Sequence, residues 1–403
     1  MSKIRLTTAG ESHGPWEICV VEGIPAGLPL SADDIDTELA RRQKGYGRGG
    51  RMTIETDRCE VLAGVRLGVT IGSPIAILVP NADHKNWTSA MRTAGGGAQS
   101  AAASDSSVPR PGHADFAGMA KYHQYGIRPI LERASARETV ARVAGGAVCR
   151  RLLAELGVTV RGRVVSIGEV SLQGGNAEYT RPESIDWEAV EASVMACEDA
   201  SLTQSMRAAV DAARDRGDSL GGVFEIWAWG LCPGLGSHVS SEERLDGRLL
   251  GAMGSIPGVK GAEIGCAFRN ATLPGSQVHD VFMVEEHAHR RGIIRPTNRA
   301  GGLEGGMTNG MPVVIRAAMK PIPTLTEPLA SVDVATLEAS RAHVERSDVT
   351  AVPAARVVGE AMVAHVLAGA YLDKFGGDSL VELLRSAEAY GNDLEGRGLW
   401  RRS

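Results

Sequence analysis

Three pairs of similar segments recur in the same order in the first and second parts of the sequence, and this repetition constrains the fold more than any other feature. The pairs are residues 17–28 with 225–235, residues 68–75 with 306–313, and residues 132–143 with 345–357. One match can arise by chance in a chain with 50 glycines, but three matches in order favour two related halves, about 1–160 and 215–375. Such halves are expected to face each other across a pseudo-two-fold axis, where a ligand cleft commonly lies.

The spacing of capping and apolar residues predicts both helices and strands in each half. Ser31 is a typical helix N-cap with acidic residues in the first turn, and its helix is expected to end near residues 41–42. Further predicted elements are helices around residues 140–148 and 357–366 and strands at residues 223–229 and 312–318. The predicted fold class is therefore α+β.

The chain is expected to form one domain over residues 1–375, with a helical insertion at about 172–217 between the halves. Residues 376–403 are expected to form a C-terminal helix and tail, with little pattern and expected disorder from about Asn392. Residues 95–107 are rich in Gly, Ala and Ser and are expected to form a mobile loop.

Composition and charge argue against several classes of function. The formal net charge is −5, so any attraction for a polyanion must be local, and an aromatic content of 4% disfavours stacking platforms for single-stranded nucleic acid. The six cysteines have no C-x-x-C spacing and are expected to be reduced and mostly buried. The N-terminus is polar and no apolar run reaches a membrane-spanning length, so we expect a soluble cytoplasmic protein without membrane or nucleic-acid partners.

Residues 41–51 contain five cations and no acidic residue, interleaved with glycines. Arginine binds carboxylate and phosphate groups through paired hydrogen bonds, so this segment is typical of a site for a small, multiply anionic substrate. The alternatives are a solvated charge run, which usually carries both signs, and an RGG-like nucleic-acid segment. Gly45, Gly47 and Gly49 only resemble a dinucleotide-binding fingerprint, because they follow a helix end and open no helix.

His13 and His113 each lie in a polar turn with a neighbouring glycine, within residues 10–15 and 109–115. A histidine in such a turn is accessible to a ligand and titrates near neutrality, as a general acid requires. A histidine that only bonds its own turn is about equally compatible with either pattern alone. Arg110 precedes His113 by three residues and favours a functional role there, because it adds a partner for an anion.

Two further arginine-containing segments, residues 133–139 and 345–348, are predicted at helix starts, where backbone N–H groups and the helix dipole attract anions. Capping serines with ordinary surface ion pairs are the alternative. Residues 301–306 and 320–324 are predicted rigid loops that suit a phosphate or a planar ring. No metal site is expected, because residues 287–289 lack a third ligand. The residues alone indicate a soluble enzyme with an arginine-rich anion pocket and one or two acid histidines.

Together these motifs resemble the chorismate synthase family, in register over about residues 4–375. The matching segments are residues 10–14, 41–49, 110–115, 132–139, 304–310, 320–324 and 345–348. The resemblance implies an α+β fold, a β-α-β sandwich of two pseudo-symmetric halves, and a homotetramer. It also implies a carbon–oxygen lyase of the shikimate pathway that forms chorismate from 5-enolpyruvylshikimate 3-phosphate by 1,4-anti elimination of phosphate. The implied cofactor is reduced FMN, with reductant supplied externally by NAD(P)H through a separate flavin reductase.

The resemblance also implies roles for individual residues. His13 is expected to protonate or bind the departing phosphate, His113 to protonate the reduced flavin, and Asp348 to assist proton transfer. The implied substrate-binding residues are Arg42, Arg48, Arg110, Arg137 and Arg346. The implied cofactor-binding residues are Arg133, Ala134, Ser135, Pro257, Gly258, Gly305, Lys320, Pro321, Ile322, Pro323, Thr324 and Arg346.

The chain departs from the family pattern at two places. Pro257 and Gly258 stand where the family often has a polar residue followed by alanine, which is compatible with a backbone contact to the flavin but not with a side-chain hydrogen bond. Val349 replaces a frequent proline and affects local loop rigidity.

Two other functions are weighed against this one. A flavin oxidoreductase would need a nicotinamide site, for which no fingerprint is visible. An RNA-binding protein would use residues 41–51 and would show steep salt dependence of binding.

Overall fold

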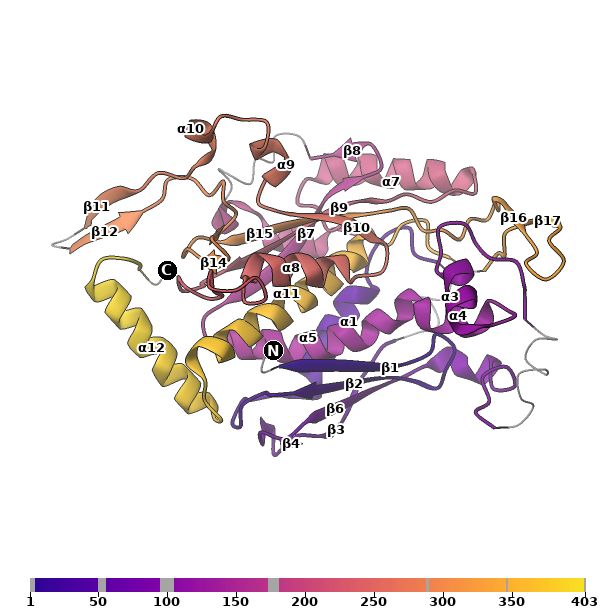
Figure 1. Cartoon of the computed structure of the whole chain (residues 1–403), viewed down its shortest axis with the longest axis horizontal. Helices are drawn as coiled ribbons and strands as arrows, with labels where there is room; N and C mark the ends of the chain where they lie inside the picture. Colours follow the sequence, from indigo (N-terminus) through magenta and orange to yellow (C-terminus); the bar gives the residue numbers. More distant parts are fainter. Residues whose placement is uncertain are drawn as a thin grey trace.

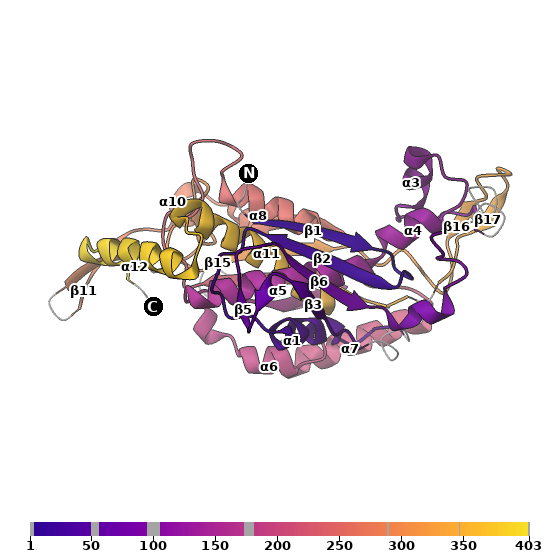
Figure 2. The same ribbon diagram turned by 90° about the horizontal axis from the view of Figure 1, so that it is seen from below.

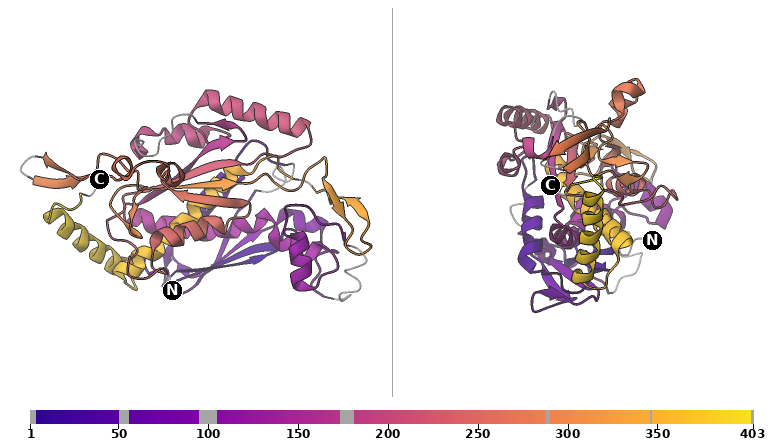
Figure 3. Two further views of the ribbon diagram at one scale, coloured as in Figure 1. Left: turned by 45° about the horizontal axis from the view of Figure 1, so that its top comes forward. Right: turned by 90° about the vertical axis from the view of Figure 1, so that its left-hand side faces the viewer.

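The computed structural model describes residues 4–49, 56–94, 105–172, 181–287, 290–345 and 347–401. A layer of helices lies between two antiparallel β-sheets (Figure 1). Figure 3 gives two further views of this arrangement, in which α12 lies at one end of the molecule and α3 and α4 at the other. The combination of helices and sheets confirms the predicted α+β class.

The first sheet is built from β1 (Arg5–Gly10), β2 (Trp16–Glu22), β6 (Ile75–Pro80) and β3 (Glu60–Ala63), in that order. Every second residue of β2 and β6 is buried, as the two-residue period of a strand requires. Cys19 pairs with Ile77, and Val21 pairs with Ile75. The side chains of Cys19 and Val21 lie against Gly145 of the helical layer. In Figure 2 the sheet is seen in front of these helices.

The second sheet has the order β10 (Val259–Ile264), β15 (Val313–Met319), β9 (Gly222–Trp229), β7 (Thr159–Ile167) and β8 (Val170–Ser171). Strands β9 and β15 agree with the two strands predicted from the sequence. The central strand β9 is buried on both faces. Phe224 and Ile226 lie against Gly359 of the helical layer, while Glu225 and Trp227 alternate to the other face.

The helical layer consists of α1 (Ala32–Gln43), α5 (Thr139–Glu155), α8 (Leu245–Gly254) and α11 (Val352–Phe375). Helix α5 packs on the first sheet, α11 packs on the second, and the two helices pack against each other. Ser31 forms the predicted N-cap, in a capping box with Asp34, and α1 ends one residue beyond the predicted end. The helices predicted around residues 140–148 and 357–366 are confirmed as parts of α5 and α11.

Helix α11 is long and apolar enough, by length and composition, to cross a membrane. The expectation that no segment reaches that length is therefore wrong. Within the protein, however, 89% of the apolar window of this helix is buried. A central helix with a sheet and other helices packed around it is mostly apolar for that reason, with the buried pair Arg356 and Glu360 as an exception.

The two sheets share one strand order, because β1, β2, β6 and β3 correspond in position to β7, β9, β15 and β10. Each half also has a short hairpin, formed by β4 (Val65–Arg66) with β5 (Val69–Thr70) and by β13 (Leu303–Glu304) with β14 (Met307–Thr308). The order of these elements parallels the repeated sequence segments. The relationship between the halves stays a prediction that superposition of one half on the other tests.

The remaining elements extend around this core. The helices are α3 (Asp115–Tyr122), α4 (Arg128–Ala134), α6 (Trp187–Ala192), α7 (Ala200–Asp215), α9 (Ala267–Asn270), α10 (Gly275–Val278) and α12 (Leu380–Gly396). The 3-10 turns are η2 (Ala82–Asn86), η3 (Ala136–Glu138) and η4 (Pro182–Ser184). The short strands are β11 (Met283–His287), β12 (Arg290–Ile294), β16 (Ala330–Val332) and β17 (Ala339–Arg341). Helices α6 and α7 occupy the segment predicted as a helical insertion.

The C-terminal residues and the six cysteines can be compared with what the sequence predicts. The expected disorder from about Asn392 is wrong, because α12 continues to Gly396 with Leu394 buried, and Trp400 lies against Gly310. The expected burial of the cysteines is confirmed, since all six are buried free thiols. Most of the expected mobile loop, residues 95–104, lies outside the described residues.

Helices α5 and α11 approach each other closely at Gly146. A Cβ added there would lie 2.3 Å from the Cβ of Ala361 and 2.6 Å from its Cα, so Gly146→Ala requires the helices to separate. We expect this substitution to lower the free energy of unfolding by about 1–3 kcal/mol. The matched control is Gly247→Ala in α8, where no atom lies within 4 Å of the added Cβ and alanine's helix propensity is expected to stabilise the protein by up to about 1 kcal/mol. Equal unfolding midpoints of the two variants in urea would contradict this account.

Candidate functional site

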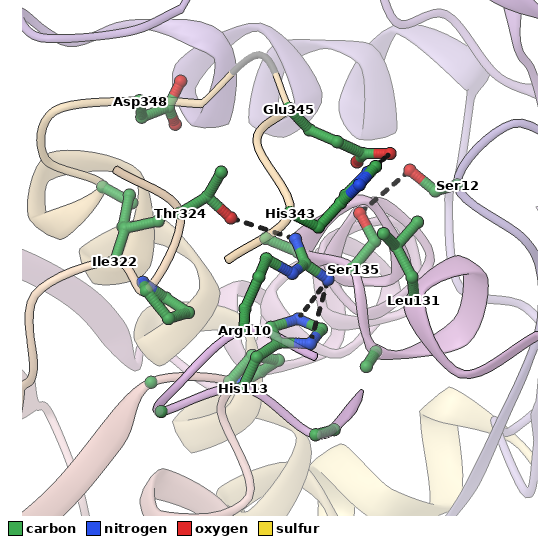
Figure 4. Close-up of a pocket in the computed structure, with 18 of the residues that line it drawn as sticks. Ser12, Arg110, His113, Leu131, Ser135, Ile322, Thr324, His343, Glu345 and Asp348 are labelled. Atoms are coloured by element: carbon green, nitrogen blue, oxygen red, sulfur yellow. Dashed lines mark hydrogen bonds and ion pairs between the residues drawn. The ribbon is translucent and has the colours of Figure 1, made fainter. Parts of the chain in front are cut away.

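A cavity of about 750 Å³ lies where segments from both sequence halves meet (Figure 4). The first half contributes the turn before β2, helix α4 and the loop before α3. The second half contributes residues 257–258, 319–324, 343–345, 348 and 351. The volume falls within the range of about 300–1,000 Å³ that is usual for small-molecule and cofactor sites.

Many residues singled out from the sequence line this cavity. They are His13, Arg110, His113, Ala134, Ser135, Pro257, Gly258, Lys320, Pro321, Ile322, Pro323, Thr324 and Asp348. Arg42, Arg48, Arg133, Arg137 and Gly305 lie elsewhere, and Arg346, Gly50 and Arg51 fall outside the described residues. The structure therefore brings both histidines and most of the expected flavin-contact positions together, while the roles of these residues stay predictions.

His13 is buried in the turn between β1 and β2 and is held by Glu132 of α4. The Nδ1 atom of His13 lies 2.8 Å from Oε1 of Glu132, and the backbone N–H of His13 donates to Oε2 at 2.8 Å. The indole ring of Trp87 lies against the imidazole, with ring centroids 3.9 Å apart. Because Glu132 and Trp87 fix the ring, Nε2 is the ring nitrogen left for a ligand in the cavity.

Glu132 is part of a series of ion-paired side chains that connects the two sequence halves. Arg128 contacts Glu132 at 3.2 Å and Glu345 at 3.1 Å. Glu345 in turn lies 3.3 Å from the ring of His343 (Figure 4). Burial alone would raise the pKa of Glu345, but His343 and the nearby arginines outweigh it and lower the pKa to about 2. Glu345 therefore stays ionised and ties the segment after β17 to α4.

His113 forms a second histidine–carboxylate pair. Its Nδ1 atom lies 2.6 Å from Oδ1 of Asp115, which is fully buried at the start of α3. Arg110 donates to the same carboxylate at 2.8 Å and to Thr324 Oγ1 at 3.0 Å (Figure 4). Burial alone would raise the pKa of Asp115, but the bonds from His113 and Arg110 outweigh it and hold the pKa well below its usual value.

One wall of the cavity is mostly apolar and exposes backbone. Gly258 has a φ of +84°, and an added Cβ would lie 2.9 Å from the terminal methyl of Met319, so the main chain lies close to that side chain. Pro321 and Pro323 continue the wall. Lys320 adds a cation, whose pKa is lowered by burial and by the neighbouring Lys260. Such a wall suits a planar ring with an anionic group at one end.

Arg42 and Arg137 are buried rather than exposed to the cavity. Arg137 forms an ion pair with Asp57 at 2.6 Å, and Arg42 lies 3.6 Å from the same carboxylate. Arg42 also donates to Thr139 Oγ1 at 3.0 Å. The two side chains therefore meet at Asp57, a residue that no sequence motif indicated.

Arg48 contacts a cavity residue from outside the lining. Its guanidinium lies 3.4 Å from Asp348, and the backbone N–H of Gly49 donates to Asp348 at 2.6 Å. Arg133 points towards β1, where it donates to Thr8 and to the carbonyl of Gly10. The arginines of the basic segment at residues 41–49 therefore contact different acidic residues and do not converge in the cavity.

The helix start predicted within residues 133–139 is confirmed, with Ser135 as the cap of the first turn, whereas the start predicted within residues 345–348 is wrong. Residues 133–139 contain the end of α4 at Ala134, a break at Ser135, and η3, so α5 begins only at Thr139. Residues 345–348 precede α11, which begins at Val352. Glu345 and Asp348 line the cavity instead, and α11 begins only after them.

Several cavity residues were missed by the sequence analysis. Arg128 and Leu131 lie three residues apart on one face of α4, and this helical spacing was a usable signal. His343 lies two residues before the noted Glu345. Trp87, in contrast, has no motif around it that indicates a site.

Glu17 of β2 is a buried carboxyl group without a hydrogen bond from any described residue. Burial raises its pKa from 4.5 to about 7, against the opposing effect of Arg137 and Arg133. Since the folded-state pKa lies above the unfolded value, the folded state binds the extra proton between about pH 4.5 and 7. Its stability therefore falls as pH rises through that window, by roughly 3 kcal/mol in total.

Glu17→Gln should remove this penalty and raise the free energy of unfolding by up to roughly 3 kcal/mol at pH 8, with little change at pH 4.5. Urea unfolding at both pH values measures the difference. An equal effect of the substitution at the two pH values would show that the carboxyl group does not titrate in this window.

The chain was compared with known proteins. A family model described as chorismate synthase matches residues 4–372. The chain is 54% identical to a chorismate synthase of Moorella thermoacetica over 398 residues, covering 97% of this chain and 99% of that protein. It is 50% identical to a chorismate synthase of Aquifex aeolicus, covering 97% and 98%.

A solved structure titled "Crystal Structure of Chorismate Synthase" aligns with a TM-score of 0.78 and 41% identity over 98% of both chains. A family match over nearly the whole chain, about 50% identity to full-length relatives and a shared fold lead to one conclusion. The chain belongs to the chorismate synthase family.

Proposed function

We propose that the protein is a carbon–oxygen lyase that converts 5-enolpyruvylshikimate 3-phosphate to chorismate by 1,4-anti elimination of phosphate, in the shikimate pathway. One observation carries this proposal beyond family membership. Two histidines, His13 and His113, each paired with a buried carboxylate, line one cavity together with the cations Arg110, Arg128 and Lys320. This arrangement suits a substrate that carries two carboxylates and one phosphate.

The family implies a flavin cofactor, and we propose reduced FMN. The backbone-lined wall at Gly258, Met319 and residues 320–324 fits a planar ring, and Lys320 and Arg110 offer positive charge for a phosphate. Ala134 and Ser135 would face the same ligand. When bound, the reduced flavin supplies electron density to the reacting ring, with no net redox change. We propose that NAD(P)H provides the reductant through a separate flavin reductase.

Individual side chains of the protein would carry out the proton transfers. Elimination breaks the C–O bond to phosphate and removes one proton from the substrate ring. His13 would donate its Nε2 proton to an oxygen of the departing phosphate and so offset the charge that develops there. His113, oriented by Asp115, would hold a proton on the flavin side of the cavity. Asp348, held by Gly49 and Arg48, would relay the ring proton.

The test is an anaerobic reaction of the purified protein with reduced FMN and the proposed substrate, with phosphate and chorismate followed together. Equal release of both products, absent with oxidised FMN, is the expected result. Failure to form product while FMN is bound would favour the flavin oxidoreductase alternative. Absence of both product and FMN binding would overturn the proposal.

We also propose a cytoplasmic homotetramer without nucleic-acid or membrane partners. Exposed apolar side chains around the β4–β5 hairpin support a protein contact there, since Leu62, Leu67 and Ile71 are each more than half exposed. Sedimentation equilibrium is expected to give four times the chain mass. A monomer at micromolar concentration, or RNA binding at low salt, would contradict this part of the proposal.

A further inference from the structure

Glu132 makes three contacts to the turn that carries His13. Its carboxylate accepts hydrogen bonds from the backbone N–H of His13 and meets His13 Nδ1, each at 2.8 Å, and its carbonyl oxygen accepts from the N–H of Ser12 at 2.9 Å. We infer that Glu132, itself held by Arg128, is a positioning residue that keeps Nδ1 of His13 protonated and directs Nε2 towards the substrate. This inference rests on the proposed function, because it concerns the acid of that reaction.

The two side chains are almost completely removed from solvent. The side chain of His13 is 8% exposed and that of Glu132 is 4% exposed. A carboxylate in this setting interacts strongly with an adjacent imidazolium, because little water screens the pair. Two bonds from one carboxylate, to the ring and to the backbone, also fix the ring's orientation relative to its own turn.

Contacts from His13, with a further one from Arg128, keep Glu132 ionised. Burial alone would raise the pKa of Glu132, but contacts from His13 and Arg128 outweigh burial and lower it. The guanidinium of Arg128 also lies over Trp87, 5.1 Å from the ring centroid, and Trp87 in turn packs on His13. Glu132 is therefore a fixed proton acceptor, and the proton at Nδ1 stays on the histidine.

Other titratable groups near His13 lie on several elements. Nδ1 of His84, in η2, lies 2.9 Å from the backbone carbonyl oxygen of His13. Glu11 belongs to the same turn and lies near Gly14. Glu345 and His343 are connected to Glu132 through Arg128. Glu132 is thus the charged group in direct contact with the imidazole among these neighbours.

The consequence for the reaction is a defined proton path. The imidazolium of His13 gives its Nε2 proton to an oxygen of the departing phosphate as the C–O bond breaks. The product histidine is then neutral, with its remaining proton on Nδ1 against Glu132, and it regains the Nε2 proton from solvent after phosphate leaves. If Glu132 were neutral, the charged histidine would lose its counter-charge and less of it would be protonated at a given pH.

The experiment compares Glu132→Gln, which keeps the size of the side chain and removes its charge, with Arg128→Met. Nitrogen-15 NMR follows the titration of the His13 ring, assigned by difference with a His13→Asn protein, without substrate. We expect Glu132→Gln to move the midpoint of the titration down by about one pH unit and Arg128→Met to move it up. Glu138→Gln is the matched control, because this buried carboxylate pairs with Arg142 instead and should leave the midpoint unchanged.

Kinetics provide the second measurement. Glu132→Gln should lower kcat about tenfold to a hundredfold, shift the alkaline limb of the pH profile to lower pH by the same amount as the NMR midpoint, and change KM by less than about threefold. A loss of kcat without any movement of the midpoint or the pH profile would overturn the inference, as would an equal shift in Glu138→Gln. The NMR titration tests the role of Glu132 independently of the proposed function, because it can be measured even if the parent protein forms no chorismate.

Discussion

A His113→Ala variant is expected to bind 5-enolpyruvylshikimate 3-phosphate with nearly parental affinity and to turn it over about 10²- to 10⁴-fold more slowly. Binding should survive because Arg110 keeps its bonds to Asp115 and Thr324 when the imidazole is removed. Turnover should fall because the proposed mechanism assigns to His113 the proton that is held on the flavin side of the cavity. Calorimetric titration of the substrate and the rate of chorismate formation with reduced FMN measure the two effects separately.

The matched control is His279→Ala, since His279 is exposed and lies outside the cavity lining. This variant is expected to keep parental turnover and affinity. Asp115→Asn provides an intermediate case, because it leaves His113 in place without its charged partner. Parental turnover in His113→Ala would show that His113 is not a catalytic residue. A large loss of affinity with unchanged kcat would assign it to binding instead.

Local structure was predictable from the sequence where one residue pattern controls it. The cap at Ser31, helix α5 and strand β9 each follow from a periodicity or a capping residue within the element itself. The 3-10 turn η3 between the Ser135 cap and α5 was not predictable in this way, because it depends on packing of the chain along the cavity. The end of α12 depends in the same way on tertiary contacts at Leu394 and Trp400.

The candidate site was predictable as a set of residue types but not as a set of contacts. The motifs indicated His13 and Glu132 separately, yet the two lie 119 residues apart in the sequence, and only the packing of α4 against the β1–β2 turn brings them together. The basic cluster indicated Arg42 as a substrate ligand. The pairing of Arg42 and Arg137 with Asp57 could not be inferred, because Asp57 carries no local signal.

Substitution of Glu360 by glutamine is expected to lower the free energy of unfolding by about 3–5 kcal/mol. Glu360 lies on α11 and is completely buried, where it pairs with Arg41 at 2.6 Å and also with Arg150 and Arg356. Its carboxylate also accepts from the backbone N–H of Gly162 at 2.8 Å. It therefore joins α1, α5, α11 and β7, and its neutralisation leaves three guanidinium groups short of a buried counter-charge.

The dependence on pH distinguishes this effect from a simple packing defect. Burial would raise the pKa of Glu360, but Arg41, Arg150 and Arg356 outweigh it and lower the pKa below its unfolded value of 4.5. A depressed folded-state pKa contributes stability that is complete above the unfolded value and is lost as pH falls through the folded one. The difference between parent and Glu360→Gln in urea unfolding should therefore be full at pH 7 and shrink below pH 4.5. Glu388→Gln, at an exposed position of α12, should show no difference at either pH. If Glu360→Gln lowered the free energy of unfolding equally at pH 7 and pH 3, the loss would come from altered packing and not from the lost charge.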